Sequence, residues 1–167
     1  KLAAILNKYG RVDLVGKSFG VIKFTHRYQG QTCTHDISLP RKEFSTGTGH
    51  KDVQVDFDPY LKVEDDLIRR DFTINAMALA LGDDQLIDPL GGKADLDKKL
   101  LRMTSENSFP EDPLRMLRAV QLAARFNLEI EKVTLEAFEK NAGLISTISA
   151  ERIAEELNKL LIRAAKP

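Results

Sequence analysis

Two side chains of opposite charge stand close together where a helix is predicted to begin. The stretch 109–126 reads FPEDPLRMLRAVQLAARF, and Asp112 and Arg115 lie three residues apart within it. Side chains with this spacing are neighbours on a helix surface. A carboxylate only accepts hydrogen bonds, whereas a guanidinium only donates them. Held side by side, the two would present an acceptor next to a donor, which is the pattern along half of a base pair.

The order of acceptor and donor favours some nucleobases over others. Cytosine and adenine offer an amino donor beside a ring acceptor, whereas guanine and uracil carry an oxygen at the corresponding place. The pair Asp112 and Arg115 therefore suits C and A. The same residues also allow a purely structural interpretation, because Asp followed by Pro113 is a common start of a helix. Both interpretations stay open at the level of sequence.

A second polar cluster is predicted in the stretch 67–81, LIRRDFTINAMALAL. Its apolar residues follow a helical spacing, and a bend after Asp71 would bring Arg70, Asp71 and Asn75 together. Such a set of donors and acceptors fits a ribose hydroxyl and a phosphate. The alternative is a solvated helix start that Asp71 caps.

A single carboxylate in a predicted strand is the third candidate. Asp36 opens the sequence DISLPR, where it is either a surface residue of an edge strand or a metal ligand. The dipeptide of His35 and Asp36 imitates a metal-binding dyad, but neighbouring side chains of a strand point to opposite faces. We interpret Asp95 and Asp97, which follow a glycine pair, as a similar imitation in a short helix.

The elements that must position these residues change character along the chain. Apolar and polar residues alternate early, as in a half-buried antiparallel sheet, and helical spacing dominates later. The pattern predicts an α+β protein with a small antiparallel or mixed sheet followed by an all-helical part. In order, the predicted segments are strands within 11–39, a long loop over 41–60, a helical region from 63, a hairpin formed by 85–88 and 100–103 with a short helix, and helices from 105 onward.

Composition excludes several classes of protein. Lys plus Arg and Asp plus Glu both number 25, so no overall basic character indicates nucleic-acid binding. Cys33 is the single cysteine, which excludes an internal disulfide and a cysteine-rich zinc site. No apolar run reaches membrane-spanning length. We expect a cytoplasmic protein with no membrane partner.

Five short motifs, taken in their order and spacing, give the sequence a strong resemblance to a known family. It resembles the class II tRNA nucleotidyltransferases and bacterial poly(A) polymerases, the family of CCA-adding enzymes. The motifs that carry the resemblance are GKSFG at 16–20, DISLPR at 36–41, RRDFTINA at 69–76, EDPLR at 111–115 and SAERIAEEL at 149–157.

The resemblance implies an architecture and a gap. It implies a polymerase β-like nucleotidyltransferase head over residues 1–103 and a helical neck over 104–167, followed by body and tail domains that grip tRNA. The family's first motif, a Gly-Gly turn and a strand with Asp-x-Asp, carries two metal-binding carboxylates and would precede Lys1. We therefore expect the chain alone to be inactive.

The resemblance also implies a reaction and a role for each candidate residue. The reaction would be template-independent addition of C and/or A to the 3′ end of tRNA from CTP and ATP, with Mg²⁺ as cofactor. Poly(A) polymerase, or a non-catalytic nucleotide- or RNA-binding fragment, are the alternatives. The implied roles are metal binding and catalysis for Asp36, ribose and phosphate binding for Arg70, Asp71 and Asn75, base selection for Asp112 and Arg115, orientation of the Arg115 fork for Glu111, and nucleotide binding for Arg118.

Overall fold

The alternating pattern near the N-terminus forms a three-stranded antiparallel sheet in the order β1-β2-β3. The computed structural model describes residues 1–15, 20–45 and 53–164, and for 41–45 and 53–57 it describes the backbone alone. The motif at 16–20 therefore lies, except for Gly20, outside the described residues, as do residues 46–52 of the predicted loop. Helix α1 (Leu2–Leu6) precedes β1 (Arg11–Val15), β2 (Val21–Tyr28) and β3 (Gln31–Ser38).

The predicted long loop over 41–60 is wrong in part, because two strands lie within it. These are β4 (Arg41–Ser45) and β5 (Val53–Phe57), which pair with each other. The sequence of β5 is VQVDF, and its strict alternation of apolar and polar residues is the period of a strand. The backbone divides into two compact units, one of Lys1–Phe44 with Gln54–Leu61 and one of Ser45–Val53 with Lys62–Pro167.

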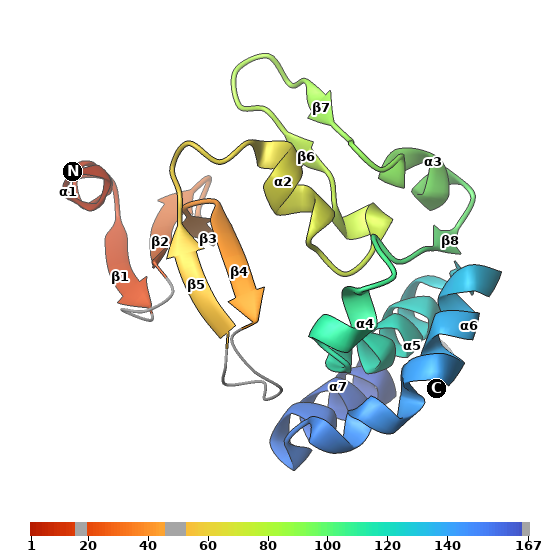
Figure 1. The fold of residues 1–167 in the computed structure, drawn as a ribbon. Coiled ribbons are helices and arrows are strands. Elements are labelled where there is room, and N and C mark those ends of the chain that lie inside the picture. Colours follow the sequence, from red (N-terminus) through yellow and green to blue (C-terminus); the bar gives the residue numbers. More distant parts are fainter. Residues whose placement is uncertain (16–19, 46–52, 165–167) are drawn as a thin grey trace. The chain divides into compact units, whose positions relative to one another are not determined.

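The second unit is mainly helical (Figure 1), with strands of only two residues. The α+β class predicted from the sequence is therefore confirmed. None of the described helices is long and apolar enough to cross a membrane. The elements of this second unit are α2 (Val63–Ile68), η1 (Thr73–Asn75), β6 (Ala78–Leu79), β7 (Leu86–Ile87), α3 (Gly92–Asp97), β8 (Leu100–Leu101), α4 (Ser108–Glu111), α5 (Leu114–Phe126), β9 (Glu129–Ile130), α6 (Lys132–Asn141), η2 (Ala142–Thr147) and α7 (Ala150–Arg163).

The helix predicted through 67–81 ends at Ile68. The backbone N–H of Thr73 donates to the carbonyl of Arg102 at 2.9 Å, and the N–H of Thr104 donates to the carbonyl of Asp71 at 3.2 Å. Backbone groups that pair with a distant segment are not available to a helix, which needs the same groups for bonds four residues apart. The bend expected after Asp71 is therefore the start of a turn that leaves the α-helix and contains the short 3₁₀ helix η1.

The predicted hairpin of 85–88 with 100–103 is also wrong. Strand β7 pairs antiparallel with β6, and β8 pairs parallel with β9. The short helix between them is present as α3, and it is followed by Lys99 in the left-handed region with φ 55°. This residue ends the helix and lets β8 begin.

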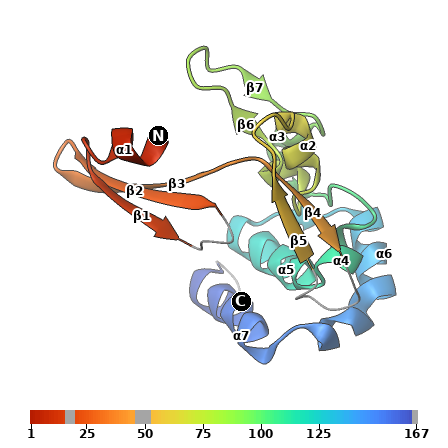
Figure 2. The same cartoon turned by 60° about the vertical axis from the view of Figure 1, so that its left-hand side comes forward.

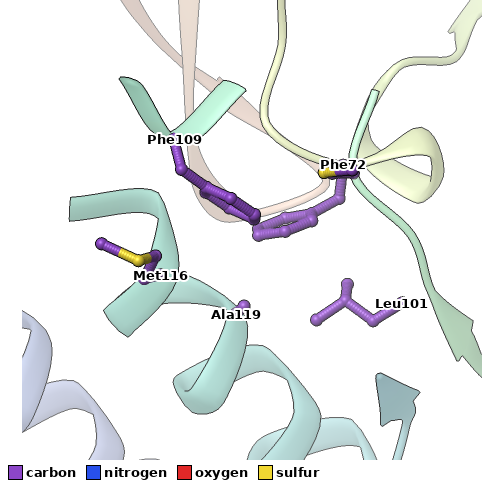
Figure 3. Close-up of a cluster of buried hydrophobic side chains, with 6 residues drawn as sticks. Phe72, Leu101, Phe109, Met116 and Ala119 are labelled. Atoms are coloured by element: carbon purple, nitrogen blue, oxygen red, sulfur yellow. The ribbon is translucent and has the colours of Figure 1, made fainter. Parts of the chain in front are cut away.

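An apolar core holds the turn after α2 against the first half of α5. Phe72 and Phe109 are fully buried, and Figure 3 shows both rings above the α5 residues Met116 and Ala119. Phe138 of α6 meets Phe109 edge to face, with 4.8 Å between ring centroids. Helices α5 and α7 pack against each other, and both views place them side by side (Figure 2). The core therefore fixes the segment that carries Asp71 relative to α5.

Candidate functional site

Asp71 is the centre of the polar cluster in the turn after α2. Its side chain is 9% exposed, and both carboxylate oxygens accept hydrogen bonds. Oδ1 accepts from the backbone N–H of Phe72 at 2.9 Å and from Nδ2 of Asn75 at 3.1 Å. Oδ2 accepts from Nε and Nη2 of Arg118 at 3.0 and 2.8 Å. Each oxygen thus has two donors, and this number satisfies a carboxylate.

Arg70 lies at the edge of the same turn. Its Nη1 donates to the backbone carbonyl of Asn75 at 3.2 Å, and its Nη2 lies 3.5 Å from Oδ2 of Asp66. About half of its side chain is exposed to solvent. The structure therefore brings together Arg70, Asp71 and Asn75, the three residues that the sequence grouped, and leaves the Arg70 guanidinium accessible to an anion.

The backbone of this turn is held by side chains of the segment 104–115, which leads into α5. Residues 69–71 each present a carbonyl that accepts a hydrogen bond from a side chain located between residues 104 and 115. The donors are the Thr104 hydroxyl to the Arg70 carbonyl, the Ser108 hydroxyl to the Asp71 carbonyl at 3.3 Å, and Nη2 of Arg115 to the Arg69 carbonyl at 3.1 Å. Three consecutive peptide groups are thereby held in one geometry.

Arg115 braces the turn through its hydrogen bond to the Arg69 carbonyl and holds Ser108 through two others. Nη1 donates to the backbone carbonyl and the hydroxyl of Ser108 at 3.3 and 3.1 Å. Glu111 lies 3.8 Å from the same nitrogen, consistent with its expected role of orienting the guanidinium, although half of the Glu111 side chain is exposed. The Arg115 side chain is 14% exposed. Its guanidinium thus donates to groups of the protein itself, and little of its side chain is exposed to a ligand.

Asp112 has a different set of partners. Oδ1 accepts from the backbone N–H of Leu114 at 3.3 Å, a contact that stabilises the first turn of α5. Oδ2 lies 3.3 Å from Nη2 of Arg152, which α7 supplies. The capping interpretation thus has a geometric basis. A nucleobase-reading role for Asp112 stays a proposal, and Arg152 is one guanidinium donor beside its carboxylate.

Arg118 is surrounded by carboxylates from three parts of the chain. Burial acts to lower its pKa, but Asp71, Glu156 and Asp112 raise it above the ordinary value, so the guanidinium stays charged. Glu156 is itself 4% exposed and accepts from Nζ of Lys159 at 2.8 Å. The side chain of Arg118 is 41% exposed. This arginine therefore neutralises acidic groups at the junction of the turn, α5 and α7.

Asp36 lies in the first unit, and we describe it separately. It stands opposite Lys23 in the β2–β3 register, with 3.8 Å between Nζ and Oδ1, and its side chain is 66% exposed. Among the described residues, no group of three His, Cys, Asp or Glu side chains lies close enough to hold a metal ion. These residues alone therefore do not fit an Mg²⁺ site, to which Asp36 would contribute one ligand.

The two aspartates after the glycine pair have partners on nearby side chains. Asp95 is buried, and its Oδ2 accepts from the Thr73 hydroxyl at 2.6 Å and from Nε of Arg102 at 2.9 Å. Asp97 is exposed and pairs with Lys93 at 3.2 Å. Neither carboxylate is directed at a shared ligand position.

Sequence reasoning missed three residues that shape this site. Thr104 and Ser108 carry no local signal, because polar residues before a helix normally serve as caps. Arg152 lies in the motif at 149–157, and only the family resemblance drew attention to that stretch. Within the described residues, Nη1 of Arg152 is buried and has no hydrogen-bond partner.

Two family models match the chain. Residues 2–102 match the model described as the poly A polymerase head domain, and residues 127–165 match the model described as a probable RNA and SrmB-binding site of polymerase A. The first match covers more than half of the chain and includes the turn with Asp71. The second begins where α5 ends.

Individual relatives and solved structures agree with these matches. The chain is 44% identical over 152 residues to the multifunctional CCA protein of Haemophilus ducreyi, covering 88% of the chain and 35% of that protein. It is 47% identical over 96 residues to the CC-adding tRNA nucleotidyltransferase of Geobacter sulfurreducens, covering 58% of the chain and 22% of that protein. The chain thus spans at most about a third of the length of these relatives.

The fold is similar to solved structures of the same kind. The CCA-adding enzyme of Bacillus stearothermophilus in complex with CTP matches with a TM-score of 0.75 and 30% identity, over 92% of this chain and 35% of that one. The Thermotoga maritima CCA-adding enzyme complexed with tRNA matches with a TM-score of 0.70 and 30% identity, over 92% and 33% of the two chains.

Proposed function

The chain belongs to the family of poly A polymerase head domains, and from this premise we propose that it forms the nucleotide-binding part of an enzyme that adds C and A to the 3′ end of tRNA. The substrates would be CTP, ATP and the tRNA end, and the reaction would take place in the cytoplasm. The head would extend over residues 1–103 and the neck over 104–167, a division that the two family matches at 2–102 and 127–165 support.

The observation that carries this proposal is the contact between Asp71 and Arg118. It joins the turn with the ribose-binding candidates to the helix with the base-selecting candidates, by two hydrogen bonds of 3.0 and 2.8 Å. A protein that selects a nucleotide without a nucleic-acid template must read ribose and base in one fixed frame. A rigid link between the two sets of residues supplies such a frame.

Each candidate residue has a proposed task in this frame. The half-exposed Arg70 guanidinium would bind phosphate, whereas Asn75 would bind a ribose hydroxyl. Asp112 would accept from the amino group of C or A, with a guanidinium donor beside it. Arg115, held by Glu111, would support this edge, and Asp71 and Arg118 would hold the ribose-binding turn.

Metal binding is the part of the proposal that needs more than the described residues. Metal-assisted nucleotidyl transfer uses carboxylates that hold divalent ions, and we propose Mg²⁺ as the ion. Asp36 would be one ligand or would orient one. The remaining carboxylates would come from a part of the protein that is not among residues 1–167, as would the body and tail that hold tRNA.

The experiment that tests the function is product sizing with the full-length gene product that contains residues 1–167. A radiolabelled tRNA that ends at its discriminator base would be incubated with CTP, ATP or both. Extension by C, C, A supports the proposal, extension by two C residues identifies a CC-adding enzyme, and a long A tail identifies a poly(A) polymerase. No extension under any condition contradicts it and favours a non-catalytic nucleotide- or RNA-binding protein.

A further inference from the structure

We infer that Arg118 is a positioning residue that determines ribose selectivity, because it holds Asp71 and, through Asp71, orients the amide of Asn75 towards the nucleotide sugar. This inference deepens the proposed function and rests on it. It assigns discrimination between ribonucleotides and 2′-deoxyribonucleotides to a residue of α5 that contacts neither the sugar nor the base.

The hydrogen bonds of Asp71 show why this carboxylate is not itself the sugar contact. Four donors already satisfy it, two of them from Arg118 and one each from Phe72 and Asn75. A ribose hydroxyl would have to displace one of these donors in a site that is almost closed to solvent. Asp71 therefore acts on the nucleotide through the groups that it orients.

Asn75 is the group that Asp71 orients. Its Nδ2 donates to Oδ1 of Asp71 at 3.1 Å, so the amide oxygen of Asn75 faces away from the carboxylate. The side chain is partly exposed, and within the described ranges the amide oxygen has no hydrogen-bond partner. An amide oxygen in this state can accept a hydrogen bond from the 2′-hydroxyl of a ribose, and a 2′-deoxy sugar, which keeps only its 3′-hydroxyl, cannot donate that bond.

The charges around Arg118 exclude the simplest alternative, direct binding of the triphosphate. Asp71 pairs with the guanidinium directly, and Glu156 and Asp112 act on it electrostatically. A phosphate that approached Arg118 would therefore also approach three carboxylates, which repel it. Arg70, whose guanidinium is half exposed at the edge of the turn, is the better phosphate ligand. The geometry thus leaves Arg118 with a positioning role.

The inference is tested by Arg118→Lys in the full-length gene product. Lysine keeps the positive charge but cannot reproduce the planar, two-nitrogen contact with one oxygen. We expect the ratio of kcat/KM for CTP to that for 2′-dCTP to fall about tenfold, the size of effect that loss of one well-aligned hydrogen bond produces. The ratio for CTP to UTP is expected to stay within about twofold, since base selection depends on other groups.

Arg125→Lys is the matched control. It makes the same change on the same helix, at a residue whose guanidinium stacks on the ring of Phe126. Both ratios are expected to stay unchanged in this variant. Thermal unfolding of all variants separates selectivity from folding, and Arg118→Gln, which retains a planar amide donor, provides a second variant if the lysine variant does not fold.

The possible outcomes separate this inference from the function beneath it. If the unaltered protein adds neither C nor A, the proposed function fails. If it adds them, and folded Arg118 variants lose activity equally towards CTP and 2′-dCTP, Arg118 is merely structural and the inference is overturned. A changed choice between C and U with constant sugar discrimination would also overturn it, because Arg118 would then act on the base.

Discussion

Nη2 of Arg115 donates a hydrogen bond to the backbone carbonyl of Arg69, with 3.1 Å between the two atoms and 46 residues between them in sequence. A guanidinium that was predicted to face a nucleobase therefore braces the turn that carries Asp71. An arginine has five N–H donors, so bracing does not prevent it from presenting a further donor to a ligand. In the structure, however, its described role is to hold two segments together.

Replacing Arg115 should destabilise the protein. Arg115→Met removes the hydrogen bond to the Arg69 carbonyl and both hydrogen bonds to Ser108, whose carbonyl keeps the backbone N–H of Asp112 at 3.3 Å, so we expect a loss on the order of 1–3 kcal/mol in the free energy of unfolding. Glu111→Gln removes only an exposed partner at 3.8 Å and should cost less than about 0.5 kcal/mol. Urea unfolding of both variants measures the difference. Equal stability of the two would contradict the bracing role.

Local sequence patterns were sufficient to identify the residues of the turn and the start of α5. Arg70, Asp71 and Asn75 lie within six consecutive residues, so a single bend brings them together whatever the rest of the fold. Helix α5 starts directly after Pro113 and ends before Asn127, whose φ of 53° is left-handed. Pro113 before the helix and a left-handed residue after it are both local signals of helix ends, and the first of them is the signal that indicated the start of α5.

Contacts between distant segments were beyond this kind of reasoning. The partner of the Asp112 carboxylate is Arg152, 40 residues away, and the partner of Asp71 is Arg118, 47 residues away. Spacing rules consider neighbours three or four residues apart, and at that distance Asp112 meets Arg115. The packing of α5 on α7 decides which guanidinium the carboxylate meets, and no single stretch of sequence contains that information.

Gly92 is predicted to be intolerant of a side chain. A Cβ atom there would lie 2.1 Å from the backbone carbonyl oxygen of Thr73, so Gly92→Ala must separate α3 from the turn. We expect a loss of about 1–3 kcal/mol or more, as for other overpacked sites. Gly143→Ala is the control, since nothing lies within 4 Å of its Cβ and its φ is not positive. Thermal unfolding of both variants measures the difference, and equal melting temperatures would contradict the close approach of Gly92 to the Thr73 carbonyl.

Asp88 should give the protein an acid-sensitive contribution to stability. Burial slightly opposes its charge, but hydrogen bonds from the backbone N–H groups of Gly92 at 2.7 Å and Lys93 at 2.9 Å, together with the neighbouring N–H groups of Gly91 and Leu90, lower the pKa of this carboxyl below its ordinary value. Because the folded pKa is below the unfolded one, the contribution is present above about pH 4 and is lost as pH falls through the folded pKa.

Carbon-detected NMR titration of the Asp88 carboxyl measures this directly. The same contribution should vanish from the pH dependence of urea unfolding in Asp88→Asn, because the amide cannot titrate. A titration midpoint of Asp88 at or above the value for unfolded aspartate would show that these backbone N–H groups do not stabilise the charge.

Asp36 is predicted to matter for turnover and not for stability. Its side chain is 66% exposed and its pair with Lys23 spans 3.8 Å, so Asp36→Ala should change the free energy of unfolding by less than about 0.5 kcal/mol. Nucleotide incorporation by the full-length gene product should fall about 10- to 100-fold or more, as expected for a group that holds or orients a metal ligand. Asp13→Ala, in the same sheet, is the control and should retain activity. If the two variants turn over alike, Asp36 is a surface residue of its strand.

Asp112 allows capping and base selection to be separated, because the two roles respond differently to the loss of its charge. Asp112→Asn keeps an oxygen that can accept from the Leu114 N–H, so the cap should survive. The ion pair with Arg152 is lost, and because that pair is partly exposed the cost in stability should stay near or below about 1 kcal/mol. An NH₂ group now stands where the carboxylate oxygen met an amino group, and it can donate to the O4 of uracil or the O6 of guanine.

If Asp112 selects the base, kcat/KM for UTP and GTP should therefore rise relative to CTP and ATP in the full-length gene product. If Asp112 only caps α5, the four values should keep their order. Glu106→Gln, the same change from carboxylate to amide at an exposed residue six positions earlier, should leave nucleotide preference unchanged and controls for a general loss of negative charge. An Asp112→Asn protein with wild-type preference and wild-type unfolding would fit the capping role alone and would leave base selection to other residues.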